Sequence, residues 1–384
     1  MQHFIHLTMA LALALGGCVT KKEMPTYAGG NVSPDAAGNT APTAHTAALN
    51  ASVGQDLPLS DPQDFEDAKR GLIASDAELR VGGAAGAPIW DMVAYGFVHG
   101  DPPPSVNPSL WRQERLNNIH GLFEVTKGVY QLRGYDLANM SLIEGETGWI
   151  VVDPLTAKET ARAALAFARK HLGDKPVSAV VFTHSHVDHF GGVLGILAPE
   201  DAENRKVPII APELFIEEAT SENIIAGVTM ARRSLFMFGP RLPRGERGHV
   251  GSGLGKGPAY GTISILQPTE TIIETPTGLT IDGVKFVFQN APGSEAPSEL
   301  TFYLPDLKAF CGAEVVSHNM HNLYTLRGAK VRDAVKWSGY IDEIIALFGD
   351  AEVYFGSHHW PIWGNDRIIG FLEKQRDTYK YIND

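Results

Sequence analysis

Four side chains that can bind metal ions lie within six residues, at His184, His186, Asp188 and His189. An apolar run that ends at Phe182 precedes them, and two glycines follow. The pattern predicts a buried strand whose C-terminal end delivers the four side chains into a tight turn before a helix. The alternating imidazoles can converge on one ion, whereas Asp188 and His189 face another direction and could bind a second. Such donors suit zinc; the alternative is a polar loop of hydrogen-bonded histidines.

A centre with two metal ions needs more donors than this cluster supplies, and later positions offer them. Glu295, Glu314 and the adjacent pair His358 and His359 each follow an apolar, strand-like run. One glutamate at the end of a strand is usually solvated. Together with the histidine cluster, these residues form a natural completion of a metal site at one edge of a sheet.

Composition limits the class of protein and of partner. The chain has 384 residues, of which 44% are hydrophobic, so it can bury a sizeable core. Its formal net charge of −12 argues against nucleic acid as a partner, because a surface that binds phosphates needs a basic patch. A small anionic substrate remains compatible with this charge if a few arginines and lysines gather locally.

The N-terminus has the features of a processing signal. An apolar run at Phe4–Gly17 ends in Leu15-Gly16-Gly17-Cys18, so that residues 1–18 resemble a bacterial lipoprotein signal. This predicts a lipid anchor and a periplasmic or cell-envelope location; the alternative is an apolar N-terminal helix of a cytosolic protein. Residues 19–65 are rich in Ala, Gly, Pro, Thr and Ser, and we expect a disordered tether. The one remaining cysteine, Cys311, implies no disulfide.

Residues 66–384 are expected to form a single domain of the α/β (α+β) class. Hairpin-spaced β-branched and aromatic runs at 121–153 are followed by a helical pattern at 157–171 and by the apolar run before the histidines. A second set of strand-like runs at 263–311 is followed by helical patterns at 332–348 and 366–382. Two sets of strands, each followed by helices, would pack as two sheets between helix layers.

The cluster Thr183–His189 resembles the metal motif of the metallo-β-lactamase superfamily, whose fold is an αββα sandwich of two mixed sheets. Further segments are similar to one branch, the alkylsulfatases that hydrolyse alkyl sulfates such as dodecyl sulfate. They are Asn107–Arg112, Asn118–Val125, Gly148–Leu155, Met230–Arg233, His321–Ala329 and Ser357–Pro361. The resemblance covers most of residues 85–384.

The resemblance implies two zinc ions per chain. His184, His186 and Glu295 would bind one ion, and the second would be held by Asp188, His189 and His359. Glu314 and a water or hydroxide would bridge the two. His358 is the alternative to His359, which is preferred because it lies two residues after Ser357. Members of the family continue into a dimerisation domain and a sterol-carrier-like domain that this chain, ending at Asp384, is expected to lack; a homodimer stays an open prediction.

The activity that the resemblance implies is hydrolysis of linear primary alkyl sulfates to alcohol and sulfate by a water that two zinc ions activate. Arg327 is the favoured sulfate ligand, because a planar guanidinium can take two oxygens at once. His321 or Tyr324 would protonate or orient the ester oxygen. The other candidates for binding the substrate are Asn322, His318, Arg232, Arg233 and Lys256.

Two further features leave alternatives open. The glycine-rich segment 251–257 could form a backbone nest for sulfate or a mobile lid. Phe236, Phe238, Trp360 and Trp363 could line an alkyl channel, although such residues are more often part of a core. Other functions that fit the cluster are a lactamase, thioesterase or phosphodiesterase of the same superfamily, or a non-catalytic envelope lipoprotein that binds amphiphiles.

Overall fold

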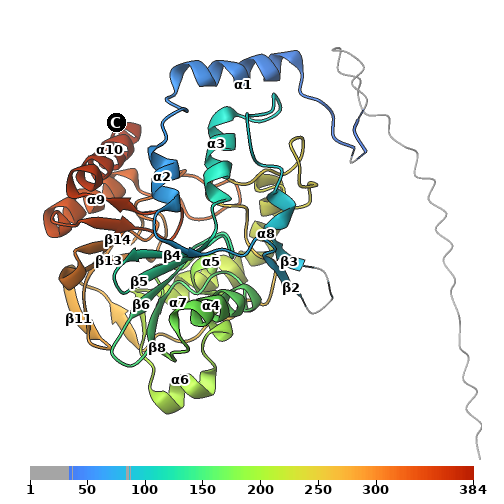
Figure 1. The fold of residues 1–384 in the computed structure, drawn as a ribbon. Coiled ribbons are helices and arrows are strands. Elements are labelled where there is room, and N and C mark those ends of the chain that lie inside the picture. The colour runs from blue at the N-terminus through green and yellow to red at the C-terminus, as the bar shows by residue number, and fades with distance from the viewer. Residues whose placement is uncertain (1–33, 37, 84–85, 87) are drawn as a thin grey trace, which may run out of the picture.

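The structure is a computed structural model that describes residues 34–36, 38–83, 86 and 88–384 (Figure 1). The predicted lipoprotein signal at residues 1–18 lies outside the described residues. Within the described part of the chain, we find no helix that is both long and apolar enough to cross a membrane.

The larger sheet has eight strands in the spatial order β1-β4-β5-β6-β7-β8-β9-β10. It combines antiparallel hairpins from β1 to β7 with parallel pairing from β7 to β10. Its strands are β1 (Leu72–Ala74), β4 (Gly121–Thr126), β5 (Val129–Arg133), β6 (Met140–Glu144), β7 (Trp149–Val152), β8 (Val177–Val181), β9 (Ile209–Pro212) and β10 (Glu270–Ile272).

The second sheet has six strands in chain order, and only the β14–β15 pair is parallel. Its strands are β11 (Thr277–Ile281), β12 (Val284–Asn290), β13 (Leu300–Leu304), β14 (Ala309–Cys311), β15 (Val353–Phe355) and β16 (Ile362–Trp363). A separate small ribbon consists of β2 (Arg80–Gly82) and β3 (Pro88–Asp91).

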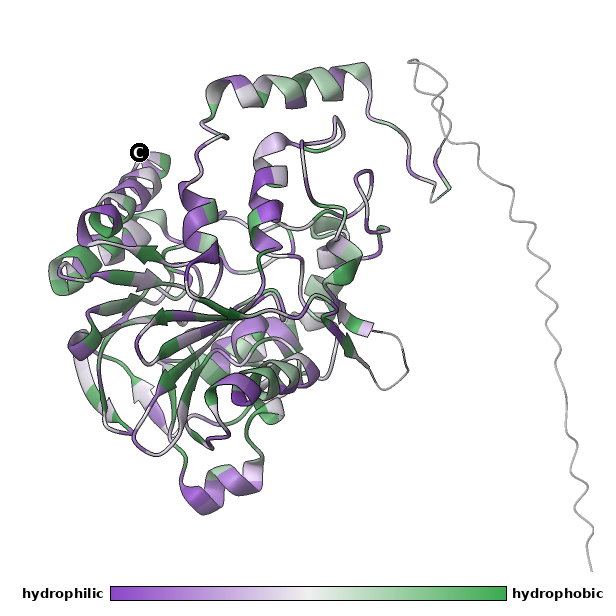
Figure 2. Cartoon of the chain, in the orientation of Figure 1, coloured by the Kyte–Doolittle hydropathy of each residue, from purple (hydrophilic) through white to green (hydrophobic). Residues whose placement is uncertain are grey.

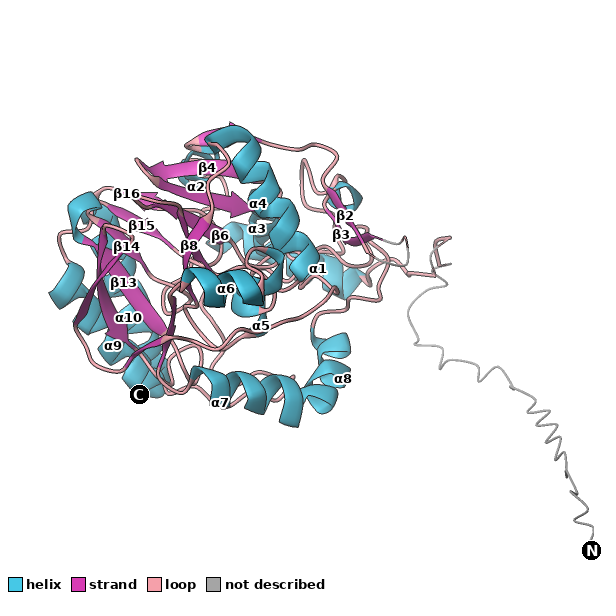
Figure 3. Cartoon of the chain, turned by 90° about the horizontal axis from the view of Figure 1, so that it is seen from below, coloured by secondary structure: helices cyan, strands magenta, loops and turns pink. Residues whose placement is uncertain are grey.

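The α-helices lie mainly outside the two sheets (Figure 3). They are α1 (Ala44–Asp56), α2 (Gln63–Lys69), α3 (Pro108–Asn117), α4 (Lys158–Leu172), α5 (Val187–Phe190), α6 (Pro199–Arg205), α7 (Phe215–Thr220), α8 (Gly227–Met237), α9 (Ala334–Phe348) and α10 (Asn365–Asn383). Short 3-10 turns occur at η1 (Val93–Tyr95), η2 (Val193–Gly195) and η4 (Pro305–Leu307), and a π-helical turn, η3 (Ser221–Ile225), joins α7 to α8.

The period-two alternation of the strands divides the core into three layers. On β7, Trp149 and Val151 face the layer that contains α4, whereas Ile150 and Val152 face the second sheet. Phe286 and Phe288 of β12 meet them from the other side. Successive side chains of a strand point to opposite faces, so each sheet buries one face against the other sheet and one against helices. Figure 2 shows hydrophobic residues concentrated in these strands.

The predicted αββα sandwich of two mixed sheets is confirmed. The outer layer of the larger sheet includes α4, whose buried stripe of Ala161, Ala164, Leu165 and Ala168 follows the helical period. The outer layer of the second sheet is formed by α9 and α10.

The expectation of disorder across residues 19–65 is wrong for part of that segment. Residues Ala44–Asp56 form α1, and the Thr43 hydroxyl caps it by accepting a hydrogen bond from the Thr46 N–H at 3.1 Å. Several alanines in this stretch explain the difference, because alanine has the highest helix propensity of all residues. A composition that buries little apolar surface still allows a capped helix.

Candidate metal centre

The strands that carry the predicted ligands end at the same edge of the sandwich. Strands β7 and β8 run parallel, and so do β14 and β15, while β12 runs in the direction of β14 because β13 is antiparallel to both. The C-terminal ends of these five strands therefore lead into Asp153, the histidine cluster, Glu295, Glu314 and His358 at one site.

Asp153 orders the histidine cluster. One of its carboxylate oxygens accepts the Thr183 N–H at 2.8 Å, and the other accepts hydrogen bonds from the Thr183 hydroxyl and the Ser357 hydroxyl, both at 2.7 Å. The same oxygen lies 2.9 Å from Nδ1 of His189. Burial raises the pKa of Asp153, but His189, His184 and Thr183 together outweigh burial and hold the pKa below its ordinary value. The second nitrogen of His189 is thereby directed at the centre.

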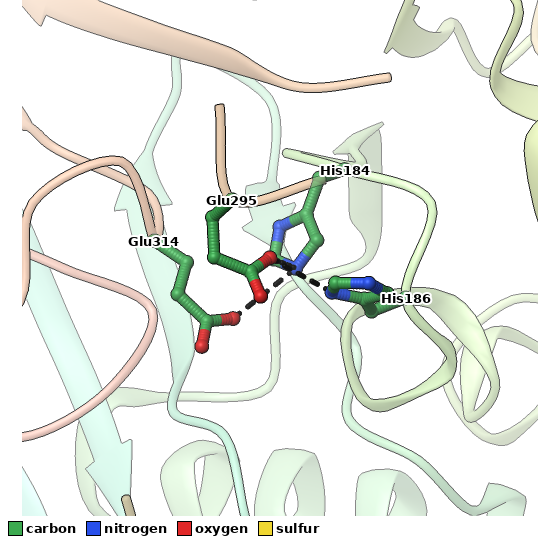
Figure 4. Close-up of side chains that lie close together, drawn as sticks. All are labelled: His184, His186, Glu295 and Glu314. Atoms are coloured by element: carbon green, nitrogen blue, oxygen red, sulfur yellow. Dashed lines mark ion pairs between the residues drawn. The ribbon is translucent and has the colours of Figure 1, made fainter. Parts of the chain in front are cut away.

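The first candidate ligand group consists of His184, His186, Glu295 and Glu314, all buried (Figure 4). One donor atom from each lies within 4.8 Å of the others. Nδ1 of His186 is 2.8 Å from a carboxylate oxygen of Glu295, and Nε2 of His184 is 3.3 Å from Glu314 Oε2. The two carboxylates point toward the imidazoles from the second sheet, so the group joins both halves of the fold.

The second candidate group consists of Asp188, His189 and His358. Nε2 of His189 is 3.2 Å from Asp188 Oδ2, and Nε2 of His358 is 3.7 Å from the same oxygen. Glu314 lies between the two groups, because its Oε2 is 3.4 Å from His189 Nε2 and 3.2 Å from His358 Nε2. This position suits a bridging carboxylate.

The preference for His359 over His358 is wrong as a placement. His359 has a left-handed backbone, with φ of 62°, and its Nε2 lies 3.1 Å from the Gly253 carbonyl oxygen. Burial, with the neighbouring His318 and His358, lowers the pKa of His359 to about 3. The strand end therefore presents His358 to the centre and turns His359 toward the glycine-rich segment.

The cluster has the properties of a cation site. Among the described residues, four buried atoms at this place have no hydrogen-bond partner of good geometry: Nε2 of His184, His186 and His189 and Oε2 of Glu295. Buried polar atoms are rarely left without partners. Divalent ions with a preference for nitrogen and oxygen ligands, such as zinc, would satisfy such atoms at the two groups. The donor set therefore fits a metal.

Charges around the cluster keep its carboxyl groups ionised. Burial raises the pKa of Glu295, yet the Arg332 guanidinium, which contacts both its carboxylate and its backbone oxygen, acts together with His186 and His321 to bring that pKa well below the usual range. Burial likewise raises the pKa of Glu314, and His358 together with His184, His189 and His321 outweighs burial and lowers that pKa well below its ordinary value. Burial lowers the pKa of His189, but Asp188 and Asp153 raise it well above the ordinary value.

Some of the predicted catalytic and substrate-binding residues meet this centre. Nε2 of His321 lies 3.2 Å from Oε1 of Glu295 and 3.2 Å from Oε1 of Glu314. Asn322 is adjacent, but its side-chain oxygen already accepts a hydrogen bond from Arg332 at 2.9 Å. Nη2 of Arg327 lies 3.6 Å from Glu222, whose carboxylate is 3.5 Å from Nε2 of His186. Arg327 therefore lies at the rim of the metal centre.

Other predicted substrate ligands do not meet it. Lys256 is buried and donates to the Glu114 carboxylate at 2.7 Å, so the prediction that it binds sulfate is wrong as a placement. His318 is also buried, and its Nε2 lies 2.8 Å from the Trp360 carbonyl oxygen. Tyr324 is 65% exposed, and Arg232 is exposed on α8. No contact at the centre tests the roles predicted for His318, Tyr324 and Arg232.

The residues predicted to line an alkyl channel differ in whether they are buried or exposed. Trp360 packs in a small core with Leu116, and Trp363 belongs to the core between the sheets. Phe236, by contrast, is 92% exposed on α8. The two tryptophans are therefore core residues, as their type predicts.

Four residues that contact the centre from outside the ligand set were missed as site residues: Asp153, Glu222, Glu299 and Arg332. Asp153 stands in a segment that resembles the alkylsulfatases, and this was the signal that could have found it. Glu222 and Arg332 both come from regions that are predicted to be helical. Nothing in their spacing distinguishes them from surface charges, because only the tertiary fold brings them inward.

Residues 133–358 match the metallo-beta-lactamase superfamily. Because this match covers more than half of the chain, the protein belongs to that superfamily. The predicted resemblance is thus confirmed at the level of the superfamily and of the fold.

Within the superfamily, the chain is similar to named alkylsulfatases. It is 47% identical over 342 residues to a linear primary-alkylsulfatase from Pseudomonas sp., across 88% of this chain and 51% of that protein. It is 48% identical over 341 residues to the alkyl/aryl-sulfatase BDS1 from Saccharomyces cerevisiae, across 88% of this chain and 53% of the other.

A solved structure agrees with these relatives. The stereoselective inverting sec-alkylsulfatase Pisa1 from Pseudomonas sp. superposes with a TM-score of 0.88 at 46% identity, over 91% of this chain and 55% of that one. The chain therefore spans about half the length of the relatives that it matches.

Proposed function

We propose that this chain catalyses the zinc-dependent hydrolysis of linear primary alkyl sulfates to alcohol and inorganic sulfate. The observation that carries the proposal is the mixed cluster in which Glu295 and Glu314 face His184 and His186, with Arg327 at its rim. The similarity to proteins named alkylsulfatases supports the same activity.

In this proposal one zinc ion would be held by His184, His186 and Glu295, and the other by Asp188, His189 and His358, with Glu314 available to both. Zinc bound there would activate a water molecule at neutral pH and offset the negative charge of the sulfate group. In two of these imidazoles, the ring nitrogen that faces away from the centre has its own polar partner, and this contact fixes the orientation of the ring. His189 is held by Asp153 and His358 by the Leu137 carbonyl oxygen, whose distance to Nδ1 is 3.2 Å.

His321 and Arg327 are the residues proposed to handle the ester. Burial lowers the pKa of His321, but the carboxylates of Glu295 and Glu314 raise it above its ordinary value, which favours a proton on this imidazole. That proton can be donated to the ester oxygen of the leaving group. The Arg327 side chain is 19% exposed, and a planar guanidinium can take two sulfate oxygens at once.

An apolar surface beside the centre supports an alkyl substrate. Glu222, which contacts His186, belongs to η3, and η3 and α8 expose Ile225 at 81%, Val228 at 67% and Phe236 at 92%. Figure 3 shows α7 and α8 at the margin of the molecule. Exposed apolar side chains that form a contiguous patch are typical of a binding surface. An alkyl chain whose sulfate lies at the cluster could extend along them.

The test combines metal analysis with sulfate release. We expect two zinc ions per chain by elemental analysis and release of sulfate from dodecyl sulfate, with slower release from a secondary alkyl sulfate of similar length. Glu314→Ala is the control and should lose both metal and activity while its melting temperature shows that it is folded. Fewer than about one zinc per chain together with no sulfate release would contradict the proposal and favour a non-catalytic amphiphile-binding protein.

A further inference from the structure

The two glutamates of the first ligand group lie on separate loops, and one buried carboxylate contacts both loops. Oε2 of Glu299 accepts hydrogen bonds from the N–H groups of Glu295 and Ala296, each at 3.0 Å, and from the Ser294 hydroxyl at 2.8 Å. Oε1 accepts the N–H of Glu314 at 3.2 Å. The side chain thus spans the gap between the loop that follows β12 and the loop that follows β14.

The backbone of Glu299 extends this connection to the larger sheet. Glu299 forms an isolated antiparallel bridge with His184. Its neighbours complete the junction, because the Leu300 N–H donates to the Thr183 carbonyl oxygen at 2.8 Å and the Ser185 N–H donates to that of Ser298 at 3.1 Å. Three members of the first ligand group, His184, Glu295 and Glu314, are therefore attached to this one residue.

Neither the hydrogen bonds nor the burial of Glu299 is explained by packing alone. Its side chain is fully buried, and its four donors come from the described segments that carry the ligands. A buried carboxylate is costly unless hydrogen bonds compensate it. The same hydrogen bonds also fix the backbone positions of Glu295 and Glu314, and hence the positions that their carboxylates can reach.

We propose that Glu299 is a positioning residue for the metal centre: it fixes the Glu295 and Glu314 loops relative to each other and to His184, so that both carboxylates reach one ion. The proposal rests on the proposed function. Partners that orient metal ligands in this way usually contribute about 10- to 100-fold to metal affinity.

The variant Glu299→Gln tests the positioning role, because it can keep the hydrogen bonds to one loop and lose the hydrogen bond to the other. With its amide oxygen toward Ser294, Glu295 and Ala296, the variant keeps three of the hydrogen bonds. Its NH₂ group then faces the Glu314 N–H, so two donors oppose each other and the Glu314 loop is displaced. The matched control is Asp67→Asn, because Asp67 is also a buried acid but pairs with Arg367, away from the ligand loops.

The readouts are zinc affinity, measured by competition with a chromophoric chelator, and the absorption spectrum of the cobalt-substituted protein. We expect Glu299→Gln to weaken zinc binding about 10- to 100-fold and to alter the cobalt spectrum. Asp67→Asn should lower the melting temperature and leave zinc affinity and spectrum unchanged. If Glu299→Gln does not fold, Glu299→Asp keeps the charge and shortens the reach, and it should weaken zinc binding in the same direction.

The outcomes separate this inference from the proposed function. A wild-type chain that binds zinc and a Glu299→Gln variant with the same affinity and cobalt spectrum would overturn the positioning role alone. Equal weakening in Glu299→Gln and Asp67→Asn would also overturn it, because a general loss of stability would then explain the effect. A wild-type chain that binds no zinc would overturn both.

Discussion

Two buried charged clusters can be compared in this protein. In the metal centre, donor atoms of His184, His186, His189 and Glu295 converge without hydrogen-bond partners of good geometry. Beneath the glycine-rich segment, Glu114 accepts hydrogen bonds from Lys256 at 2.7 Å, Gly253 at 2.8 Å and Asn117 at 3.3 Å, so its carboxylate is paired on both oxygens.

The comparison shows how a binding site differs from a structural ion pair. Both clusters are deeply buried, and both contain residues whose types suggested function. A cluster whose atoms satisfy each other has no need of a ligand, whereas converging unpaired atoms are stable only if something else meets them. Lys256 therefore holds the glycine-rich segment against α3, and the histidine and glutamate cluster is the place for a metal.

The largest effect is expected where the two regions meet, at the adjacent histidines. His358→Asn should lose one metal ion and several kcal/mol of transition-state stabilisation, which corresponds to roughly a thousandfold loss of activity. His359→Asn should keep both ions, because that side chain contacts Gly253 and asparagine tolerates its left-handed backbone.

Elemental analysis and sulfate release from dodecyl sulfate measure these effects in the His358→Asn and His359→Asn variants. Loss of metal from the His359 variant, with full metal content in the His358 variant, would reverse the assignment made from the structure.

The next effect concerns the stability of the fold and leaves the metal centre unchanged. Lys256→Met leaves the buried Glu114 carboxylate without its cationic partner, and removing one partner of such a pair costs about 3–5 kcal/mol of unfolding free energy. Zinc content of the folded variant should stay at the wild-type value. Chemical denaturation and elemental analysis check the two parts.

The matched control for that variant is Lys285→Met. Lys285 forms an ion pair with Asp306 in which both side chains are more than 60% exposed, and such pairs contribute at most about 1 kcal/mol. If the two lysine variants lose the same stability, the structural role of Lys256 is refuted.

The smallest effect is a pH dependence in the second region. Burial, followed by the charges of Arg244 and Lys256, lowers the pKa of His249 to about 4. The unfolded chain has the ordinary value of about 6.5, so between these two values it binds a proton that the folded chain does not. The contribution of His249 to stability is therefore full above pH 6.5 and is lost as the pH falls through 4.

Melting temperatures of the wild type and of His249→Gln between pH 7 and pH 4 measure this contribution. We expect the wild-type melting temperature to fall more steeply across that range. Parallel curves would mean that His249 is not the group responsible.

Much of the fold could be predicted because it depends on local periodicity. The buried stripe of α4 follows the helical period, and the alternation of Trp149 to Val152 follows the strand period. The cluster from His184 to His189 could be recognised for a similar reason, since ligands that follow one strand lie close in the chain. The short helix α1 was missed because composition was given more weight than helix propensity.

The sequence by itself determined that a metal-binding cluster ends a buried strand, and that Glu295 and Glu314 are available to complete it. Only the tertiary structure decided which of His358 and His359 faces the centre, because one left-handed residue reverses the direction of a side chain. It also decided that Lys256 is paired with Glu114, while Arg332 and Glu299 contact the predicted metal ligands. The type of a charged residue does not by itself show its function. Its partners, which the fold brings from distant strands, determine whether it binds a ligand, contacts the residues that do, or forms a structural ion pair.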